Sequence, residues 1–143
     1  QRLRAGRMIE FVVERLSNIP ESKKAIIVFP TYEDYRAVLE SPKDDYLPCI
    51  VSLQFRLKQG KNKMILDTTF YARSIDAFQK SHGNFMAMAM ISQKIANLLE
   101  DKFNKPVLCG FLDGIIADAH IYAETTKDAL AIVSAFKNKK FKI

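Results

Sequence analysis

The sequence predicts an α/β fold of the α+β kind, in which a mixed, mostly antiparallel sheet packs on a long buried helix. The sheet is predicted by residues 51–57 and 64–72, which alternate apolar and polar side chains on either side of a polar turn. The helix is predicted by residues 84–103, which are apolar nearly all round for their first three turns. Because each carries apolar surface, the two elements should bury it against one another in layers.

Size and composition fit one globular domain over residues 1–143. Of these 143 residues, 48% are hydrophobic and 27% charged, which allows a real core and does not match the disordered class. The apolar stretches are too short to span a bilayer, so we expect no membrane contact. Two cysteines with no secretory leader and no disulfide spacing predict reduced thiols in a cytoplasmic protein.

The segments before the hairpin predict two helices and a strand. Residues 8–16 repeat apolar positions at helical spacing, and helix-breaking residues follow them. Residues 25–30 are a continuous apolar run of strand length with β-branched residues, and Pro30 ends it. Residues 32–40 then predict a second short helix, and residues 42–48 a loop that leads into the hairpin.

The segments after the hairpin complete the helix and sheet layers. The methionines of residues 84–103 are typical of flexible core filling rather than of a ligand surface. Residues 107–116 predict a further strand with Cys109 inside it, and we interpret Cys109 as a core residue. Residues 124–136 predict a closing helix that begins near Thr125 or Thr126.

The net charge of +6 is concentrated near the C-terminus, where residues 137–142 carry four lysines and no acid. Such a segment can bind nucleic acid or another anionic ligand. Phe141 is its only aromatic residue, so it offers little surface for stacking bases. A solvated tail is therefore the favoured interpretation, and nucleic acid is not the partner we expect.

Cys49 lies at the edge of a strand, which is where a reactive thiol can meet a ligand. Arg73 ends the second strand of the hairpin, and antiparallel pairing should place it at the same end of the sheet as Cys49. A guanidinium beside a thiol favours the thiolate, and Arg73 with Ser74 could instead grip a phosphate. Taken singly, a structural cysteine, a solvated arginine and a core His120 are the ordinary interpretations.

The order of these motifs resembles the thymidylate synthase family. The resemblance runs from residues 2–4 to about residue 126, and its wording is closest to the archaeal branch and to the pyrimidine nucleotide hydroxymethylases. The motifs that carry it are PESKK at residues 20–24, LPC at 47–49, RSID at 73–76, Asn84 opening the long helix, and DAHIY at 118–122.

The resemblance implies one-carbon transfer from methylenetetrahydrofolate to carbon 5 of a pyrimidine nucleotide. Cys49 would add to carbon 6 of the ring, which divides one hard step into two easier ones. Asn84 would face the base, where an amide suits uracil and so favours dUMP over dCMP or CMP. The product would be methylated, as dTMP is, or hydroxymethylated, and no metal is implied.

The remaining roles implied by the resemblance concern the phosphate, the sugar and the cofactor. A homodimer with shared active sites is implied, in which Lys23 and Lys24 replace an arginine pair that reaches the partner's phosphate, keeping the charge but losing the bidentate fork. The further residues by role are Arg73 and Ser74 for the phosphate, His120 and Tyr122 for the sugar hydroxyl, and Asp76 near folate and base.

An alternative function is a non-catalytic nucleotide-binding or dimerisation remnant of the same fold. The family's N-terminal part, with a phosphate-binding arginine loop and a proton-handling glutamate, has no counterpart that we recognise in this sequence. Loss of a general acid/base would severely impair transfer of the one-carbon unit. Nucleotide binding and dimerisation would survive that loss.

Overall fold

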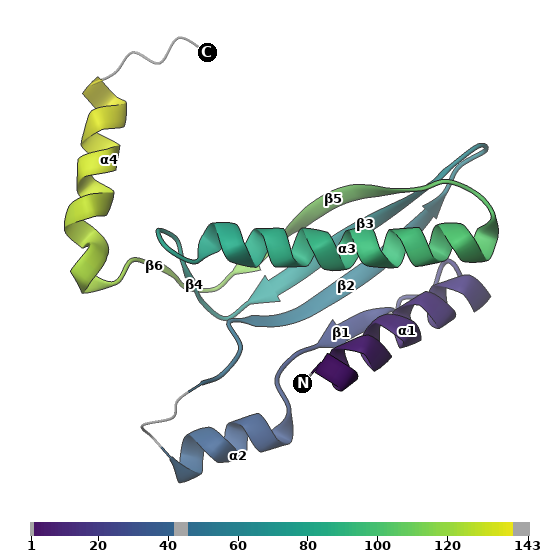
Figure 1. The fold of residues 1–143 in the computed structure, drawn as a ribbon, viewed down its shortest axis with the longest axis horizontal. Coiled ribbons are helices and arrows are strands. Elements are labelled where there is room, and N and C mark those ends of the chain that lie inside the picture. Colours follow the sequence, from purple (N-terminus) through teal and green to yellow (C-terminus); the bar gives the residue numbers. More distant parts are fainter. Residues whose placement is uncertain (1, 42–45, 139–143) are drawn as a thin grey trace.

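The computed structural model describes residues 2–41 and 46–138. It confirms an α/β fold of mixed helix and sheet; the lysine-rich segment at 137–142 and the loop at 42–48 fall partly outside the described residues. The elements are α1 (Arg2–Asn18), β1 (Ile26–Val28), α2 (Tyr32–Glu40), β2 (Ile50–Gln59), β3 (Met64–Ala72), β4 (Ile75–Asp76), α3 (Ser81–Phe103), β5 (Val107–Ile116), β6 (Ala119–His120), a 3-10 turn at Ala123–Thr125 and α4 (Thr126–Asn138) (Figure 1).

The main sheet has the strand order β1-β2-β3-β5, and β4 and β6 form a separate pair. The predicted hairpin is confirmed, with β2 antiparallel to β3 in a register that runs from Gln59 opposite Met64 to Ser52 opposite Tyr71. It then shifts by one residue, so that Ile50 lies opposite Ala72. The parallel pairing of β5 with β3 was not predicted. It arises because α3 runs back along the sheet, so that β5 starts beside the start of β3, as a helical crossover requires.

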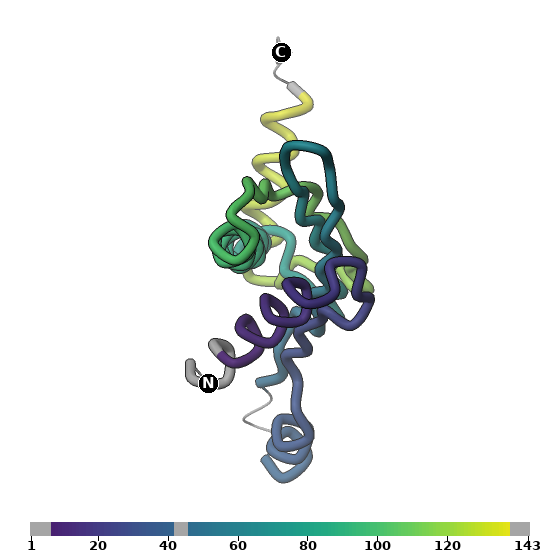
Figure 2. The backbone as a smooth tube through the Cα atoms, turned by 90° about the vertical axis from the view of Figure 1, so that its right-hand side faces the viewer, coloured from purple at the N-terminus to yellow at the C-terminus, as the bar shows by residue number. Residues whose placement is uncertain are grey.

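Helices α1 and α3 cover the same face of the sheet (Figure 2). The core between these layers contains Val12 and Leu16 of α1, Leu53 and Phe55 of β2, and Leu66 of β3. Helix α3 meets the core with one face, through Met88, Ser92, Ile95, Ala96 and Leu99. The expected burial of this helix therefore holds for one side, because Met86 and Met90 on the other are 63% and 66% exposed.

One expectation about burial was wrong because it concerns a strand at the edge of the sheet. Cys109 of β5 is exposed rather than in the core, although partial enclosure of its sulfur raises the pKa of the thiol. Its Sγ lies 3.6 Å from Gln93 Oε1 and lines a pocket of about 150 Å³ between α3 and β5. Strand β1, at the opposite edge, exposes Ile26 and Val28 and buries Ile27 between them.

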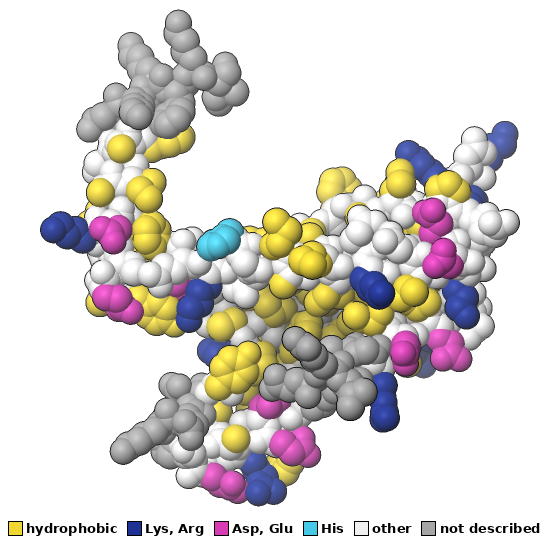
Figure 3. Space-filling model, in the orientation of Figure 1, with side chains coloured by type: hydrophobic (Ala, Val, Ile, Leu, Met, Phe, Trp, Pro, Cys, Tyr) yellow, Lys and Arg dark blue, Asp and Glu magenta, His cyan; other side chains and the backbone are white. Residues whose placement is uncertain are grey.

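Helices α2 and α4 extend away from the packed layers, and hydrophobic side chains lie on the surface of α4 (Figure 3). Helix α2 has a complete capping box, in which Thr31 Oγ1 accepts from the Asp34 N–H and the Asp34 carboxylate accepts from the Thr31 N–H. Among the described residues, none of the helices has the length and apolar character needed to cross a bilayer.

A substitution at Gly114 tests the contact between β5 and β3. A Cβ at Gly114 would overlap the carbonyl oxygen and ring of Phe70, whereas nothing lies within 4 Å of a Cβ at Gly83 in α3. We expect Gly114→Ala to lower the free energy of unfolding by about 1–3 kcal/mol through overpacking. Gly83→Ala, the matched control, should raise it by a few tenths to about 1 kcal/mol because alanine favours the helix.

Urea unfolding followed by circular dichroism measures both changes. Equal stability of the Gly114→Ala variant and the native chain would contradict the close approach of β5 to Phe70.

Candidate functional site

Cys49 and Arg73 are direct neighbours across the hairpin. Cys49 precedes β2 and Arg73 follows β3, one position beyond the pair Ile50 and Ala72. The Arg73 N–H donates to the Cys49 carbonyl oxygen at 2.9 Å, which continues the ladder by one step. The antiparallel register thus holds a half-buried free thiol and a guanidinium at one end of the sheet.

The Arg73 side chain folds back onto the segment that carries the thiol. Its Nη2 donates to the Leu47 carbonyl at 2.7 Å and its Nε to the Pro48 carbonyl at 3.2 Å. A longer contact of 3.4 Å joins Nη1 to Ser74 Oγ. These bonds use three of the five N–H donors of a guanidinium, and the exposed side chain retains capacity for an anion.

Asp76 is buried beneath the start of α3 and is only 2% exposed. Its Oδ1 accepts from the Phe78 N–H at 3.0 Å and from the Gln79 N–H at 3.2 Å. Its Oδ2 is also buried but has no hydrogen-bond partner among the described residues. A buried carboxylate oxygen without a donor is costly, so this atom is suited to accept an N–H or O–H from a ligand.

The start of α3 connects Asp76 to Asn84 through the backbone. The Lys80 N–H donates to the Asp76 carbonyl at 3.3 Å, and the Asn84 N–H donates to the Lys80 carbonyl at 3.0 Å. Asn84 therefore lies in the first turn of α3, partly exposed, one helical turn beyond Lys80. The predicted helix began at residue 84, so the structure extends it by three residues toward Asp76.

His120 pairs with Asp76 through the short parallel strands β6 and β4. Its Nδ1 is buried and has no hydrogen-bond partner in the described part of the chain, where the Asp118 Oδ2 oxygen, 3.9 Å away, is too distant for a hydrogen bond. The His120 and Tyr122 rings meet edge to face with centroids 5.0 Å apart. Within residues 2–41 and 46–138, the two buried side-chain atoms without partners, on Asp76 and His120, thus belong to neighbouring residues of one strand pair.

These residues gather at one end of the molecule, where β2 begins and β3 and β5 end (Figure 1). Backbone bonds join the two chain segments, from the Ala117 N–H to Ala72 and from the Ile75 N–H to Asp118, both 2.9 Å. The site therefore contains Cys49, Arg73, Ser74, Asp76, Asn84, His120 and Tyr122 from four stretches of the sequence.

Lys23 and Lys24 are not at this end of the molecule. Both are exposed and precede β1, and the next residue, Ala25, accepts the Phe55 N–H. Phe55 lies six residues along β2 from Cys49, a separation of about 20 Å in an extended strand. Within one chain, the lysine pair and the thiol are therefore distant.

Sequence reasoning overlooked one residue of this cluster, Lys80. Its Nζ lies 5.4 Å from the centroid of the Tyr122 ring. The only available signal was its spacing, four residues after Asp76 and four before Asn84.

Among the described residues, no group of three or more His, Cys, Asp or Glu side chains could hold a metal ion.

Substitutions at Asp76 test its role in holding the start of α3. Asp76→Ala removes the acceptor of two backbone N–H groups, and we expect a loss of about 2–4 kcal/mol in the free energy of unfolding. Asp76→Asn keeps one acceptor oxygen and should cost less than half as much. Equal losses for both variants, measured by urea unfolding, would contradict the hydrogen bonds as the cause.

A comparison with protein families identifies the family of this chain. The family model described as thymidylate synthase matches residues 5–142, which is nearly the whole chain. No individual curated protein matches the chain. The matched range includes all of the residues that gather around Cys49 and Arg73, and the chain therefore belongs to the thymidylate synthase family.

Proposed function

We propose that this chain transfers a one-carbon unit to carbon 5 of a pyrimidine nucleotide, with dUMP favoured, through a covalent bond to Cys49. Family membership supports one-carbon transfer in general. The observation that carries the specific proposal is the pairing of Cys49 with Arg73, whose backbones share a 2.9 Å hydrogen bond. A thiol beside a cation is the arrangement that nucleophilic addition to a pyrimidine needs.

The chemistry follows from the electronic character of the base. The Cys49 sulfur lone pair would form a bond to carbon 6, and the electrons of the ring double bond would move toward O4 as an enolate. Asn84 would donate to O4 and accept from N3–H, which stabilises the developing charge and favours uracil over cytosine. Carbon 5 then becomes nucleophilic and would bond the one-carbon unit, after which it would lose its proton and Cys49 would leave carbon 6. The expected product, dTMP, also needs a hydride, for which the tetrahydrofolate carrier would be the donor. Addition of water instead would give the alternative, a hydroxymethylated nucleotide.

Other residues of the cluster bind and orient the two ligands. Arg73 and Ser74 would hold the phosphate, because a guanidinium and a hydroxyl suit its oxygens. His120 and Tyr122 would hold the sugar hydroxyl. The buried Oδ2 of Asp76, which lacks a partner among the described residues, suits an N–H of folate or base. Methylenetetrahydrofolate, when bound, supplies the one-carbon unit.

The covalent proposal is tested by trapping with fluoro-dUMP and methylenetetrahydrofolate, followed by mass spectrometry of the intact chain. Fluorine at carbon 5 prevents completion of the reaction, so a Cys49 adduct should persist. Cys49→Ser should abolish the adduct. Cys109→Ser is the matched control, because Cys109 is the other free cysteine and lies outside the cluster.

Three outcomes of this experiment separate the enzyme from the non-catalytic alternative. An adduct in the native chain and in Cys109→Ser, but not in Cys49→Ser, supports the enzyme. An adduct that survives Cys49→Ser contradicts Cys49 as the nucleophile. Nucleotide binding without any adduct supports the alternative, a non-catalytic nucleotide-binding or dimerisation remnant of this fold.

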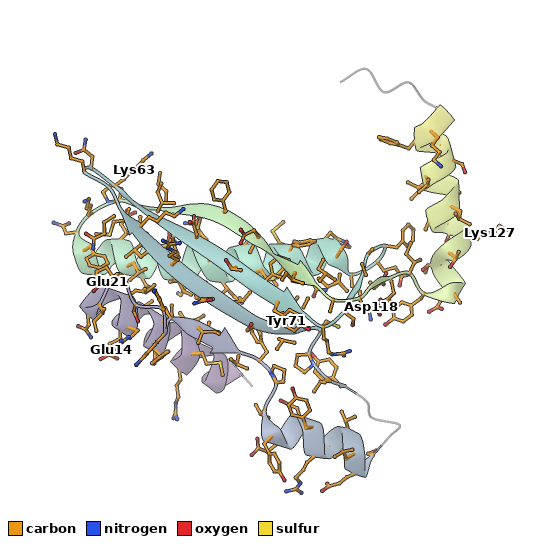
Figure 4. The ribbon with its side chains drawn as sticks, turned by 180° about the vertical axis from the view of Figure 1, so that it is seen from behind. Glu14, Glu21, Lys63, Tyr71, Asp118 and Lys127 are labelled. Atoms are coloured by element: carbon orange, nitrogen blue, oxygen red, sulfur yellow. The ribbon has the colours of Figure 1, made fainter. Side chains whose placement is uncertain are left out.

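We also propose that a second copy of the chain covers the outer face of the sheet. Figure 4 shows this face uncovered by a helix, with Tyr71 near the site and Lys63 at the hairpin tip. In the register of the sheet, its outward side chains include the exposed residues Ile26, Val28, Tyr71, Leu108, Phe111 and Ile115. Exposed apolar residues gathered on one face mark an interface.

Two charged residues of this outer face are paired with each other. Lys58 forms an ion pair with Asp67, and its Nζ lies 5.7 Å from the centroid of the Phe111 ring. Burial raises the pKa of the Asp67 carboxyl, but Lys58, the Phe111 N–H and the charge of Arg56 outweigh burial and hold the pKa below its ordinary value. A paired charge costs less to bury at an interface than a lone one.

Sedimentation equilibrium tests the homodimer. We expect the native chain to be a dimer and Ile115→Asp, on the outer face, to be monomeric at micromolar concentration. Leu39→Asp is the matched control, because Leu39 on α2 is 81% exposed and lies away from the sheet. A monomeric native chain, or equal dissociation by both substitutions, would overturn the proposal.

A further inference from the structure

Lys80 occupies the position that joins two candidate site residues. It is the N-cap of α3, and its side chain makes no capping hydrogen bond. Its backbone N–H donates to Asp76 and its carbonyl accepts from Asn84, at 3.3 and 3.0 Å. The Lys80 side chain therefore begins at the start of α3, between the candidate site residues Asp76 and Asn84.

The Lys80 ammonium lies over the Tyr122 ring, 5.4 Å from the centroid, which is within the range of a cation–π interaction. The same ring meets His120 edge to face at 5.0 Å. The three side chains form a stack that joins the start of α3 to the segment after β6. The described part of the chain gives the ammonium no carboxylate partner, so the ring is the contact that orients it.

The backbone of Tyr122 is held separately from its ring. The Tyr122 carbonyl accepts from the Thr125 N–H and hydroxyl, each at 3.0 Å, and from the Thr126 hydroxyl at 3.1 Å. These bonds anchor the main chain just before α4 but leave rotation of the ring undetermined. The ring itself contacts the Lys80 ammonium and, edge to face, the His120 imidazole.

We propose that Lys80 is a positioning residue for the sugar hydroxyl of the nucleotide. Its cation holds the Tyr122 ring, which in turn holds the His120 imidazole, whose buried Nδ1 has no partner among the described residues. A ring held in one orientation loses less entropy when it binds a hydroxyl, so binding is tighter. This inference rests on the proposed function, because it assumes that His120 and Tyr122 meet the sugar.

The test compares two nucleotides and two substitutions. Lys80→Met keeps the length of the side chain but removes the charge, and Lys80→Arg keeps a cation that can lie over the ring. Calorimetry measures binding of dUMP and of 2′,3′-dideoxyuridine monophosphate, which has the same base and phosphate but no sugar hydroxyl. Lys63→Met, at the hairpin tip far from the site, controls for the loss of one positive charge.

We expect Lys80→Met to weaken dUMP binding about two- to five-fold, which is the worth of an exposed cation–π contact. Binding of the dideoxy nucleotide should stay unchanged, and Lys80→Arg should bind dUMP as the native chain does. Equal weakening for both nucleotides would show that Lys80 only attracts the phosphate charge. No weakening for either would show that the stack does not affect binding.

A measurement without nucleotide keeps this inference distinct from the proposed function. The NMR ring resonances of Tyr122 and His120 should shift in Lys80→Met but not in Lys80→Arg or Lys63→Met. Unchanged ring resonances in Lys80→Met would overturn the contact among Lys80, Tyr122 and His120 itself. If the resonances shift in Lys80→Met but the native chain does not bind dUMP, the proposed function and the sugar role are overturned. The contact among the three side chains would then be structural alone.

Discussion

The site depends on the register of the β2–β3 hairpin. The inward residues of β2 lie opposite inward residues of β3; Phe55, for example, lies opposite Thr68. The core buries both sets. A slip of one residue would turn these side chains toward solvent, so apolar burial enforces the pairing. The hydrogen bond between Arg73 and Cys49 is the last step of this ladder. Packing of the core, followed by a one-residue register shift between Ser52 and Ile50, thereby places the backbones of Cys49 and Arg73 side by side.

A second constraint acts where the chain leaves the hairpin. Asp76 directs one carboxylate oxygen to two backbone N–H groups before α3 and keeps the other buried without a partner among the described residues. The first arrangement stabilises the helix start, and the second costs stability unless a ligand donates to it. One side chain thus serves both the fold and the site. The neighbouring His120 Nδ1 is in the same condition, which is typical of a ligand site rather than of a core.

The role that the resemblance implies for Lys23 and Lys24 requires a homodimer. Lys23 and Lys24 are far from Cys49 within one chain, so a phosphate-binding role for them requires a second copy. The outer face of the sheet, with exposed apolar residues from β1, β3 and β5, provides the surface on which such a copy could pack. The role that the resemblance implies for these lysines therefore depends on the proposed homodimer.

Local patterns predicted the elements whose signal is contained in a short window. The period of two in β2 and β3, and the long apolar segment of α3, were read correctly because each depends on neighbours along the chain. Strands β4 and β6 have two residues each and exist only through one another, so no window contains their signal. Exposure of Cys109 was missed for a related reason, because an apolar run does not say whether its strand lies at an edge.

The sequence by itself determined the longer helices and strands, the antiparallel hairpin and the family, since alternation, turn residues and ordered motifs are properties of the chain alone. Only the tertiary structure decided that β5 runs parallel to β3, that Asp76 neighbours His120, and that Lys80 lies over Tyr122. These contacts join segments about 40 residues apart, and their geometry is set by how α3 crosses the sheet rather than by any local preference.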